Sequence, residues 1–479
     1  MHPHRPHQVL PFLTFLLVIS FRLLAAEEKP NIIVIITDDQ GWADIGYNNP
    51  GRAYTPHLDR LAANGVTLTR HYVMPQCTPT RVAAMTGRYP GRFGTVPLEA
   101  SNEPAFPHGT PTLASMLKEA GYTTHLSGKW HLGSSPDHGP NHFGFDSSYG
   151  SLAGAVGMYD HRYSTKSPYS VTWHRDHAII PGYENGTHAT DLVAADATHF
   201  IRREHERPFF LYLAFHAPHT PLDERGPFVD TPTQLDPDNP KRWLNENKIK
   251  WFNDPKGVIQ REPDPEKRLL LAAVHHVDHA VGEVVTALRE TGHFDNTLIL
   301  FSSDNGPQGS WGGNAYPSDL KLTDFNQPIP MKGRKLDVWE GGIHVPGFMH
   351  WPARLKPRRE ETPVHIVDWF PTLATITGGV PPERPDGRDL SSLLLDRERL
   401  PERDFYWTWH PTINRRALSD GEWKIVRYGH GEPKQPSDWK LFRLSDDPKE
   451  QNDLAKKHPD ELKRLHDRYL SQRALDGGR

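Results

Sequence analysis

The sequence predicts an α/β fold with two parts: a large mixed, mostly parallel sheet sandwiched by helices, and a small C-terminal antiparallel sheet with a packed helix. Short apolar runs rich in β-branched or aromatic residues recur along the chain, and helical patterns separate them. Several of these runs stop at a polar cluster, as strands do when their carboxyl ends line a ligand site. After about Arg384, aromatic segments with strand-like alternation replace this pattern.

Three strands expected in the large sheet are continuous apolar runs, which is the pattern of parallel strands buried on both faces. These runs cover residues 31–36, 209–215 and 297–301, and a further, less apolar strand is expected at 122–127. The first run is followed by Asp38 and Asp39, and the last is followed by Asp304 and Asn305. We therefore expect two pairs of oxygen-bearing side chains to meet at one edge of the sheet.

Helices are expected between these strands, each ended by a glycine that can adopt the left-handed conformation. They cover residues 55–62, 111–119 and 269–290, ahead of Gly65, Gly121 and Gly292. In the C-terminal part, strands are expected at 405–409 and 423–426 and a charged helix at 459–472. The expected organisation is a leader at 1–26, a large domain at 27–383 and a smaller α+β subdomain at 384–479.

Composition excludes several classes of protein. Hydrophobic residues make up 36% of the 479 residues, which is enough for a sizeable core and argues against a disordered chain. The formal net charge is −4, so no overall positive field favours nucleic acid or an anionic membrane surface. A negatively charged ligand would need a local cluster of cations.

The N-terminus has the pattern of a secretion signal. Arg5 precedes an apolar run over residues 9–26, which ends in two small residues, Ala25 and Ala26. Arg22 interrupts this run, so it is short for a membrane span, although a retained anchor is the alternative. We expect an exported protein, periplasmic or secreted, with no stable membrane partner.

The neighbours of the single cysteine, Cys77, indicate a reactive side chain. One cysteine cannot form an intramolecular disulfide, and the ordinary interpretation is a buried inert thiol. Pro79, however, is well placed to begin a helix, which would put Cys77 just before a helix N-terminus where negative charge is favoured. Arg81 adds a fixed cation one turn on. We therefore expect an activated thiolate.

The two polar pairs after the first and last strands suit a metal ion. Carboxylate and amide oxygens from Asp38, Asp39, Asp304 and Asn305 are ligands that Ca²⁺ or Mg²⁺ prefers, and the lack of thiolate ligands makes zinc less favoured. An acidic pair such as Asp38 and Asp39 more often caps a helix or turn. The second pair, in the same strand-end setting, favours the metal site.

Three further segments hold cations and histidines. Lys129 and His131 are expected on a loop bounded by Gly128 and Gly133, and either of them could be an ordinary surface residue. A second segment, 216–219, follows a predicted strand and holds His216 and His219. The third, 332–346, contains three basic residues ahead of a Glu-Gly-Gly turn.

The segment Cys77-Thr78-Pro79-Thr80-Arg81, followed by Thr86-Gly87-Arg88, resembles the signature of the formylglycine-dependent sulfatases, an arylsulfatase-like family of the alkaline phosphatase superfamily. The segments at 128–133 and 332–346 resemble further motifs of that family, and the likeness runs in order from about residue 30 to 455. Thr80 stands where relatives often have Ser or Ala, and His344 stands where they often have Arg. We expect these departures to affect packing more than chemistry.

The resemblance implies a nucleophile and a set of site residues. A maturation enzyme would convert Cys77 to formylglycine, whose hydrate attacks sulfur; its second hydroxyl later allows sulfate to be expelled. His219 is preferred to His216 as the acid that protonates the leaving alcohol, and Lys335 to Lys332 as the sulfate ligand. The implied catalytic residues are Cys77, Arg81, Lys129, His131, His219 and Lys335. The implied ligands of Ca²⁺, or of Mg²⁺, are Asp38, Asp39, Asp304, Asn305 and the modified residue 77.

The implied activity is hydrolysis of a sulfate ester. The C-terminal aromatic segments and an insertion near 222–268 favour a sulfated carbohydrate. Trp173, Trp311 and His410 are candidate sugar contacts, although packing or a surface position is the commoner role for each. One alternative is a phosphomonoester or phosphonate hydrolase of the same superfamily. Another is a protein that binds sulfated glycans without turnover.

Overall fold

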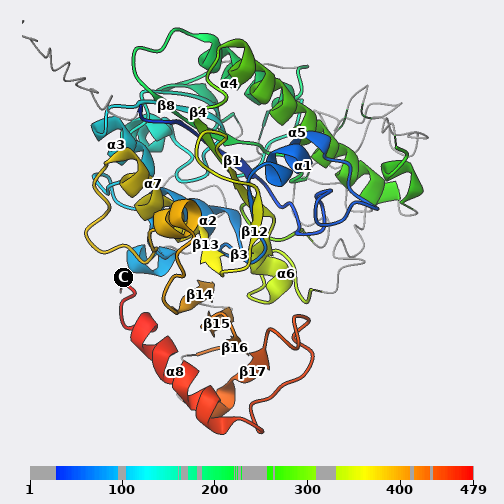
Figure 1. The fold of residues 1–479 in the computed structure, drawn as a ribbon, viewed down its shortest axis with the longest axis vertical. Helices are drawn as coiled ribbons and strands as arrows, with labels where there is room; N and C mark the ends of the chain where they lie inside the picture. Colours follow the sequence, from blue (N-terminus) through cyan, green and yellow to red (C-terminus); the bar gives the residue numbers. More distant parts are fainter. Residues whose placement is uncertain are drawn as a thin grey trace, which may run out of the picture.

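The structure is a computed structural model (Figure 1). It describes residues 28–94, 104–159, 161–162, 171–180, 186–220, 222, 224, 228, 256–262, 265–308, 331–409, 415–431 and 435–477. The expected leader at 1–26, most of the expected insertion, Trp311 and His410 lie outside the described residues.

A ten-stranded mixed sheet forms the centre of the molecule. Its strand order is β12 (Arg358–Glu360), β2 (Val66–Leu68), β11 (Gly347–His350), β9 (Thr297–Ser303), β1 (Asn31–Thr37), β8 (Phe209–Ala214), β4 (Thr123–Lys129), β5 (Ser147–Ser151), β6 (Trp173–Arg175) and β7 (Ala178–Ile179). The five strands from β9 to β5 run parallel to one another. Antiparallel strands flank this block on both sides.

Helices cover both faces of the sheet (Figure 1). One face is covered by α1 (Pro56–Ala63), α4 (Ala189–Arg202) and α5 (Pro265–Glu290), and the other by α2 (Cys77–Thr86), α3 (Leu113–Glu119) and α7 (Trp369–Thr377). Side chains of β1 alternate between the two cores, because successive residues of a strand point to opposite faces. Ile33 and Ile35 enter the first core, whereas Ile32, Val34 and Ile36 enter the second.

The C-terminal part is an antiparallel sheet with a helix on it (Figure 1, orange to red). The strands β14 (Phe405–Trp409), β15 (Arg415–Ser419), β16 (Trp423–Tyr428) and β17 (Lys440–Arg443) pair in sequence order, and α8 (Pro459–Arg473) packs on them. Trp407 joins this sheet to the main body, since its indole nitrogen donates to the carbonyl of Val73 at 2.8 Å. The predicted fold class is confirmed; the domain boundary at 384 stays a prediction.

Two small elements connect these parts. A three-stranded sheet consists of β10 (His344–Val345), β3 (His71–Tyr72) and β13 (Val364–His365), and the one-turn helix α6 (Glu340–Ile343) precedes β10.

Among the described residues, no helix is both long and apolar enough to cross a membrane.

The parallel strands bring distant segments to one edge of the sheet. In the register of β1 with its neighbours, Thr37 lies opposite Ser303 and Ile36 lies opposite Ala214. The segments that follow β9, β1, β8 and β4 therefore emerge side by side. Lys129 is the last residue of β4, not part of a loop as expected, so the strand itself fixes its backbone.

Candidate active site

The ends of β1 and β9 are tied together by hydrogen bonds. The amide of Asp304 donates to the carbonyl of Thr37 at 3.0 Å, and the amide of Asp39 donates to Asp304 Oδ1 at 3.2 Å. The amide of Gln40 donates to the hydroxyl of Ser303 at 2.9 Å. The four side chains predicted to bind a metal consequently meet at one point, and all are buried.

Asp39 holds a strained backbone conformation at this point. Its φ is +67°, in the left-handed region that residues other than glycine seldom adopt. Two side chains fix its carboxylate: Asn305 Nδ2 donates to Oδ1 at 2.7 Å, and Lys335 Nζ donates to Oδ2 at 2.8 Å. Such strain persists where the surrounding structure over-determines it, and it is common at functional sites.

The donor set fits a divalent cation. Ligand atoms of Asp38, Asp39, Cys77 and Asp304 lie within 4.8 Å of one another. The side-chain oxygen of Asn305 is buried and accepts no hydrogen bond from the described part of the chain. A buried amide oxygen without a donor is costly unless a cation binds it. The residues present thus suit an oxygen-coordinated ion such as Ca²⁺ or Mg²⁺.

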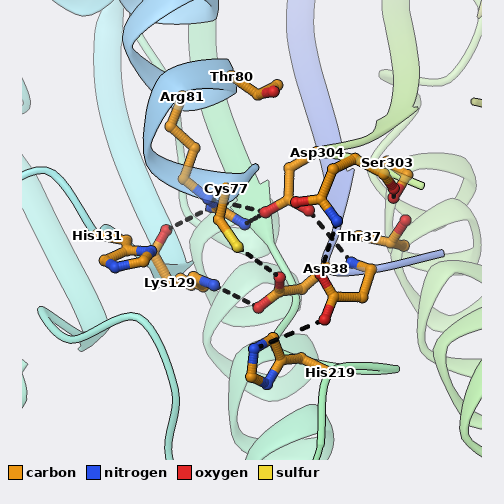
Figure 2. Close-up of polar contacts among 12 residues, drawn as sticks. Thr37, Asp38, Cys77, Thr80, Arg81, Lys129, His131, His219, Ser303 and Asp304 are labelled. Carbon is orange, nitrogen blue, oxygen red and sulfur yellow. Dashed lines mark hydrogen bonds and ion pairs between the residues drawn. The ribbon is translucent and has the colours of Figure 1, made fainter. Parts of the chain in front are cut away.

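Cys77 lies beside this cluster (Figure 2). It is the first residue of α2, which begins two residues before Pro79, the expected start, and its Sγ donates to Asp38 Oδ1 at 3.4 Å. Burial raises the pKa of the thiol well above its usual value, and the carboxylates of Asp304 and Asp38 raise it further. The expected activated thiolate is therefore wrong for the unmodified cysteine, because burial, together with the neighbouring carboxylates, outweighs the helix terminus.

Arg81 ties α2 to the end of β9. It is buried, its Nη2 lies 2.8 Å from Asp304 Oδ2, and its Nη1 donates to the carbonyl of Lys129 at 3.1 Å. The neighbouring Thr80 points away from the cluster, and its hydroxyl accepts from the amide of Met74 at 3.0 Å. The departure at Thr80 therefore concerns the turn before α2.

Two lysines pair with the aspartates that directly follow β1, and Figure 2 shows the first of these pairs, Lys129 with Asp38. Lys129 forms a fully buried ion pair with Asp38, and Lys335 pairs with Asp39. Burial, and secondly Asp304, raise the pKa of Asp38 to about 7 despite Lys129. Burial also acts to raise the pKa of Asp39, but Lys335 and His219 outweigh it and hold that pKa below its usual value.

His131 presents its imidazole without a fixed partner. Both ring nitrogens are buried, and neither forms a hydrogen bond with a described residue. Burial, followed by the charges of Lys129 and Arg81, lowers the pKa of His131 well below its usual value, so the ring is neutral. Gly154 leaves room for this ring, since a β-carbon there would lie 2.2 Å from Cε1 and Nε2. No sequence signal pointed to Gly154.

The two candidate histidines after β8 differ in their surroundings. His219 Nε2 lies 3.6 Å from Asp39 Oδ2, and its Nδ1 donates to the carbonyl of Thr220 at 2.6 Å. His216 instead stacks on Trp173, with ring centroids 5.6 Å apart. Trp173 is fully buried, so it packs the core and is not a sugar contact. Burial, and next the charge of Lys335, lower the pKa of His219 to about 3.

Comparison with known proteins identifies the family. The sulfatase family model matches residues 30–380, which is most of the chain. The chain belongs to the sulfatase family. A second model, described as the C-terminal part of N-sulphoglucosamine sulphohydrolase, matches residues 334–474.

Named relatives support the same assignment. The sulfatase is 30% identical to arylsulfatase J of Mus musculus, over 94% of this chain and 76% of the relative. It is also 30% identical to N-acetylgalactosamine-6-sulfatase of Homo sapiens, over 80% of this chain and 69% of the relative. A solved structure of Ps i-CgsB in complex with k-i-k-neocarrahexaose has a TM-score of 0.75 and 29% identity, with 94% of each chain covered. The protein is accordingly a sulfuric ester hydrolase.

In this sulfatase the two lysines of segment 332–346 have different surroundings. Lys335 reaches Asp39, whereas the ammonium of Lys332 lies 3.7 Å from the centroid of the Trp339 ring and donates to the carbonyl of Glu450 at 3.2 Å. Glu340 is buried and pairs with Lys424 of β16 at 2.8 Å. Lys332 and Glu340 thus lie in the packing around the segment, away from the acidic cluster.

Proposed function

We propose that this sulfatase removes sulfate from a sulfated carbohydrate, with a formylglycine at position 77 as nucleophile and a divalent ion, Ca²⁺ or Mg²⁺, beside it. One observation carries the proposal: Cys77 lies at the N-terminus of α2 within reach of a buried cluster of three carboxylates and an amide. The ion would be held by Asp38, Asp39, Asp304, Asn305 and the modified residue 77.

The charge of the site suits an anionic substrate. Asp38, Asp39 and Asp304 are matched by three cations, Arg81, Lys129 and Lys335. A bound divalent ion would supply Lewis-acid chemistry and two further positive charges at the point where a sulfate has to sit. The site would then be positive in a protein whose overall charge is negative.

Activation of the nucleophile would depend on the residues around position 77. A hydrated formylglycine provides two hydroxyl groups, one of which attacks sulfur. Arg81, fixed by Asp304, contributes a permanent positive charge close to that hydroxyl and favours its deprotonation. The ring nitrogens of His131 form no hydrogen bond with a described residue, and His131 would accept the proton of the second hydroxyl.

Lys129 and Lys335 would bind the sulfuryl oxygens. Both ammonium groups are held by carboxylates at the cluster, so little reorganisation is needed when the negative charge of the transition state develops. Burial opposes the charge of Lys335, yet Asp39 and the groups next to it raise its pKa well above the usual value. Lys335 therefore stays protonated over the working pH range.

His219 would protonate the leaving alcohol. Its Nδ1 is committed to Thr220, so Nε2 is the atom that faces the cluster. Because the pKa of His219 is lowered to about 3, the imidazole is neutral at neutral pH and has to gain its proton after the anionic substrate binds. The negative charge of a bound sulfate ester raises the pKa of a nearby imidazole, so substrate binding favours the protonation of His219.

The carbohydrate part of the proposal rests on relatives. The named relatives include N-acetylgalactosamine-6-sulfatases, and the structure of Ps i-CgsB contains a neocarrahexaose. We further propose that the protein is exported, with a leader at 1–26, and that a maturation enzyme converts Cys77. The division into domains at 27–383 and 384–479 is part of the same proposal.

Substrate class is tested by comparing three substrates. We expect kcat/KM for 4-nitrophenyl sulfate to exceed that for 4-nitrophenyl phosphate by at least about 100-fold, because a site with fixed charges discriminates by transition-state binding. A sulfated oligosaccharide should release inorganic sulfate in the same preparation. Preference for the phosphate ester would favour a phosphomonoesterase, and binding of the oligosaccharide without any turnover would favour a glycan-binding protein.

The two lysines of segment 332–346 provide a matched pair of variants. Lys335→Ala should lower kcat/KM by about 100- to 1000-fold, since it removes a partly buried cation from the proposed position of the sulfuryl group. Lys332→Ala should lower it by no more than about threefold, because that side chain packs on Trp339 outside the cluster. Steady-state kinetics on the aryl sulfate measure both. Equal losses would show that the wrong lysine has been assigned to the sulfate.

A further inference from the structure

The segment that carries Lys335 is held by the C-terminal sheet. Arg415, the first residue of β15, donates from Nη1 to the carbonyl of Leu336 at 2.5 Å and to Asp337 Oδ1 at 2.8 Å. Leu336 directly follows Lys335. A residue of the C-terminal sheet therefore binds the backbone next to the lysine that reaches Asp39.

Tyr428, the last residue of β16, makes a second contact with the same segment. Its hydroxyl accepts from the amide of Val338 at 3.1 Å and donates to Asp337 Oδ1 at 3.1 Å. Its ring stacks on Trp339, with centroids 5.2 Å apart and planes 10° from parallel. Arg415 and Tyr428 thus converge on one carboxylate, that of Asp337.

The segment needs these contacts because its turn is strained. Leu336 has a φ of +77°, in the left-handed region that a branched hydrophobic residue rarely occupies. The backbone on either side is pinned to the active-site end of the sheet: Lys335 N donates to the carbonyl of Pro307 at 2.9 Å, and Leu336 N donates to that of Pro75 at 2.7 Å. Relaxation of Leu336 would turn the backbone of its neighbour and move the ammonium of Lys335.

We propose that Arg415 and Tyr428 are positioning residues for Lys335, so that the C-terminal sheet sets the geometry of the catalytic lysine. The inference rests on the role proposed for Lys335 above. A lysine side chain has four rotatable bonds, and its effect on a transition state depends on how well those bonds are preset. Holding the turn at Leu336 fixes the start of that side chain, while Asp39 fixes its end.

A double-mutant cycle tests the inference. Tyr428→Phe removes one oxygen atom, and Arg415→Met removes the guanidinium; each is made in the parent enzyme and in Lys335→Met. In the parent we expect kcat/KM for 4-nitrophenyl sulfate to fall about 5-fold for Tyr428→Phe and about 30-fold for Arg415→Met, mainly through kcat. In the Lys335→Met background each change should cost less than about twofold. Arg415→Lys should recover part of the loss, because a cation opposite Asp337 is retained.

Two control variants remove similar groups elsewhere. Tyr122→Phe deletes a buried hydroxyl that donates to the carbonyl of Pro30 at 2.9 Å. Arg443→Met, on β17, deletes an exposed guanidinium that pairs with Glu422. Both should leave kcat/KM within about twofold of the parent. Melting temperatures, measured for every variant, identify any loss that comes from unfolding.

The outcomes separate this inference from the proposed function. Lys335→Met with parental activity would overturn both the role of Lys335 and its positioning. An impaired Lys335→Met combined with equal losses from Tyr428→Phe in the two backgrounds would overturn only the positioning role. Losses confined to the parent background support both.

Discussion

Replacement of Cys77 by alanine is expected to abolish hydrolysis of sulfate esters, with kcat reduced by about 10⁴-fold or more. Alanine supplies no precursor for the aldehyde, so the site keeps its cations but has no nucleophile. Residue 77 is buried next to Asp38, and alanine is smaller than cysteine, so the substitution causes no steric clash and the fold should persist. Kinetics on 4-nitrophenyl sulfate, with a melting temperature for each protein, measure the effect.

Cys77→Ser sharpens this prediction. A serine hydroxyl can attack sulfur, but it lacks the second hydroxyl through which a formylglycine hydrate expels sulfate. We expect one burst of alcohol release, about one equivalent per active site, followed by a stalled enzyme that carries sulfate on the introduced serine. Sustained turnover by Cys77→Ala would show that residue 77 is not the nucleophile, whereas sustained turnover by Cys77→Ser would contradict the role of the second hydroxyl in expelling sulfate.

Removal of the divalent ion is expected to have the second largest effect. After exhaustive chelation, kcat/KM should fall by at least about 100-fold, because the ion contributes charge at both the nucleophile and the sulfuryl group. Addition of Ca²⁺ or Mg²⁺ should restore activity, and Zn²⁺ should restore less of it, since the proposed ligands, with residue 77 as formylglycine, are all oxygens. The melting temperature should fall on chelation and rise on addition of the ion that binds.

Variants of one ligand test the same site without a chelator. Asp304→Asn keeps the size of the side chain but removes a charge of the proposed ion site that also pairs with Arg81, and it should raise the ion concentration needed for half-maximal activity. Asp446→Asn, which alters an exposed carboxylate near Arg443, should leave that concentration unchanged. Full activity in metal-free protein, verified by elemental analysis, would contradict a metal-dependent mechanism.

Much of the fold and of the candidate site was predictable, for a specific physical reason. A buried parallel strand is a continuous apolar run, so its carboxyl end is visible where the run meets polar residues. Asp38, Asp39, Asp304 and Asn305 follow two such runs, and the parallel register of β1 and β9 brings them together. The fold class followed from the same runs and is confirmed.

Other properties depend on tertiary neighbours that the sequence does not display. The sequence predicts a thiol of Cys77 activated by a helix terminus and Arg81, but burial raises the pKa of the thiol, and Asp304, which pairs with Arg81, raises it further. No sequence pattern around Gly154 indicates that it leaves space for the ring of His131. The contacts of Arg415 with the segment after Lys335 join residues far apart in the chain, and no sequence pattern marks Arg415.

The most direct test of this account is the mass of the peptide that contains residue 77, taken from active protein of the native host. We predict that most of this peptide carries an aldehyde, or its hydrate, in place of the thiol, and that the converted fraction scales with kcat across preparations. A preparation with full activity in which residue 77 is an unmodified cysteine throughout would contradict the proposed chemistry.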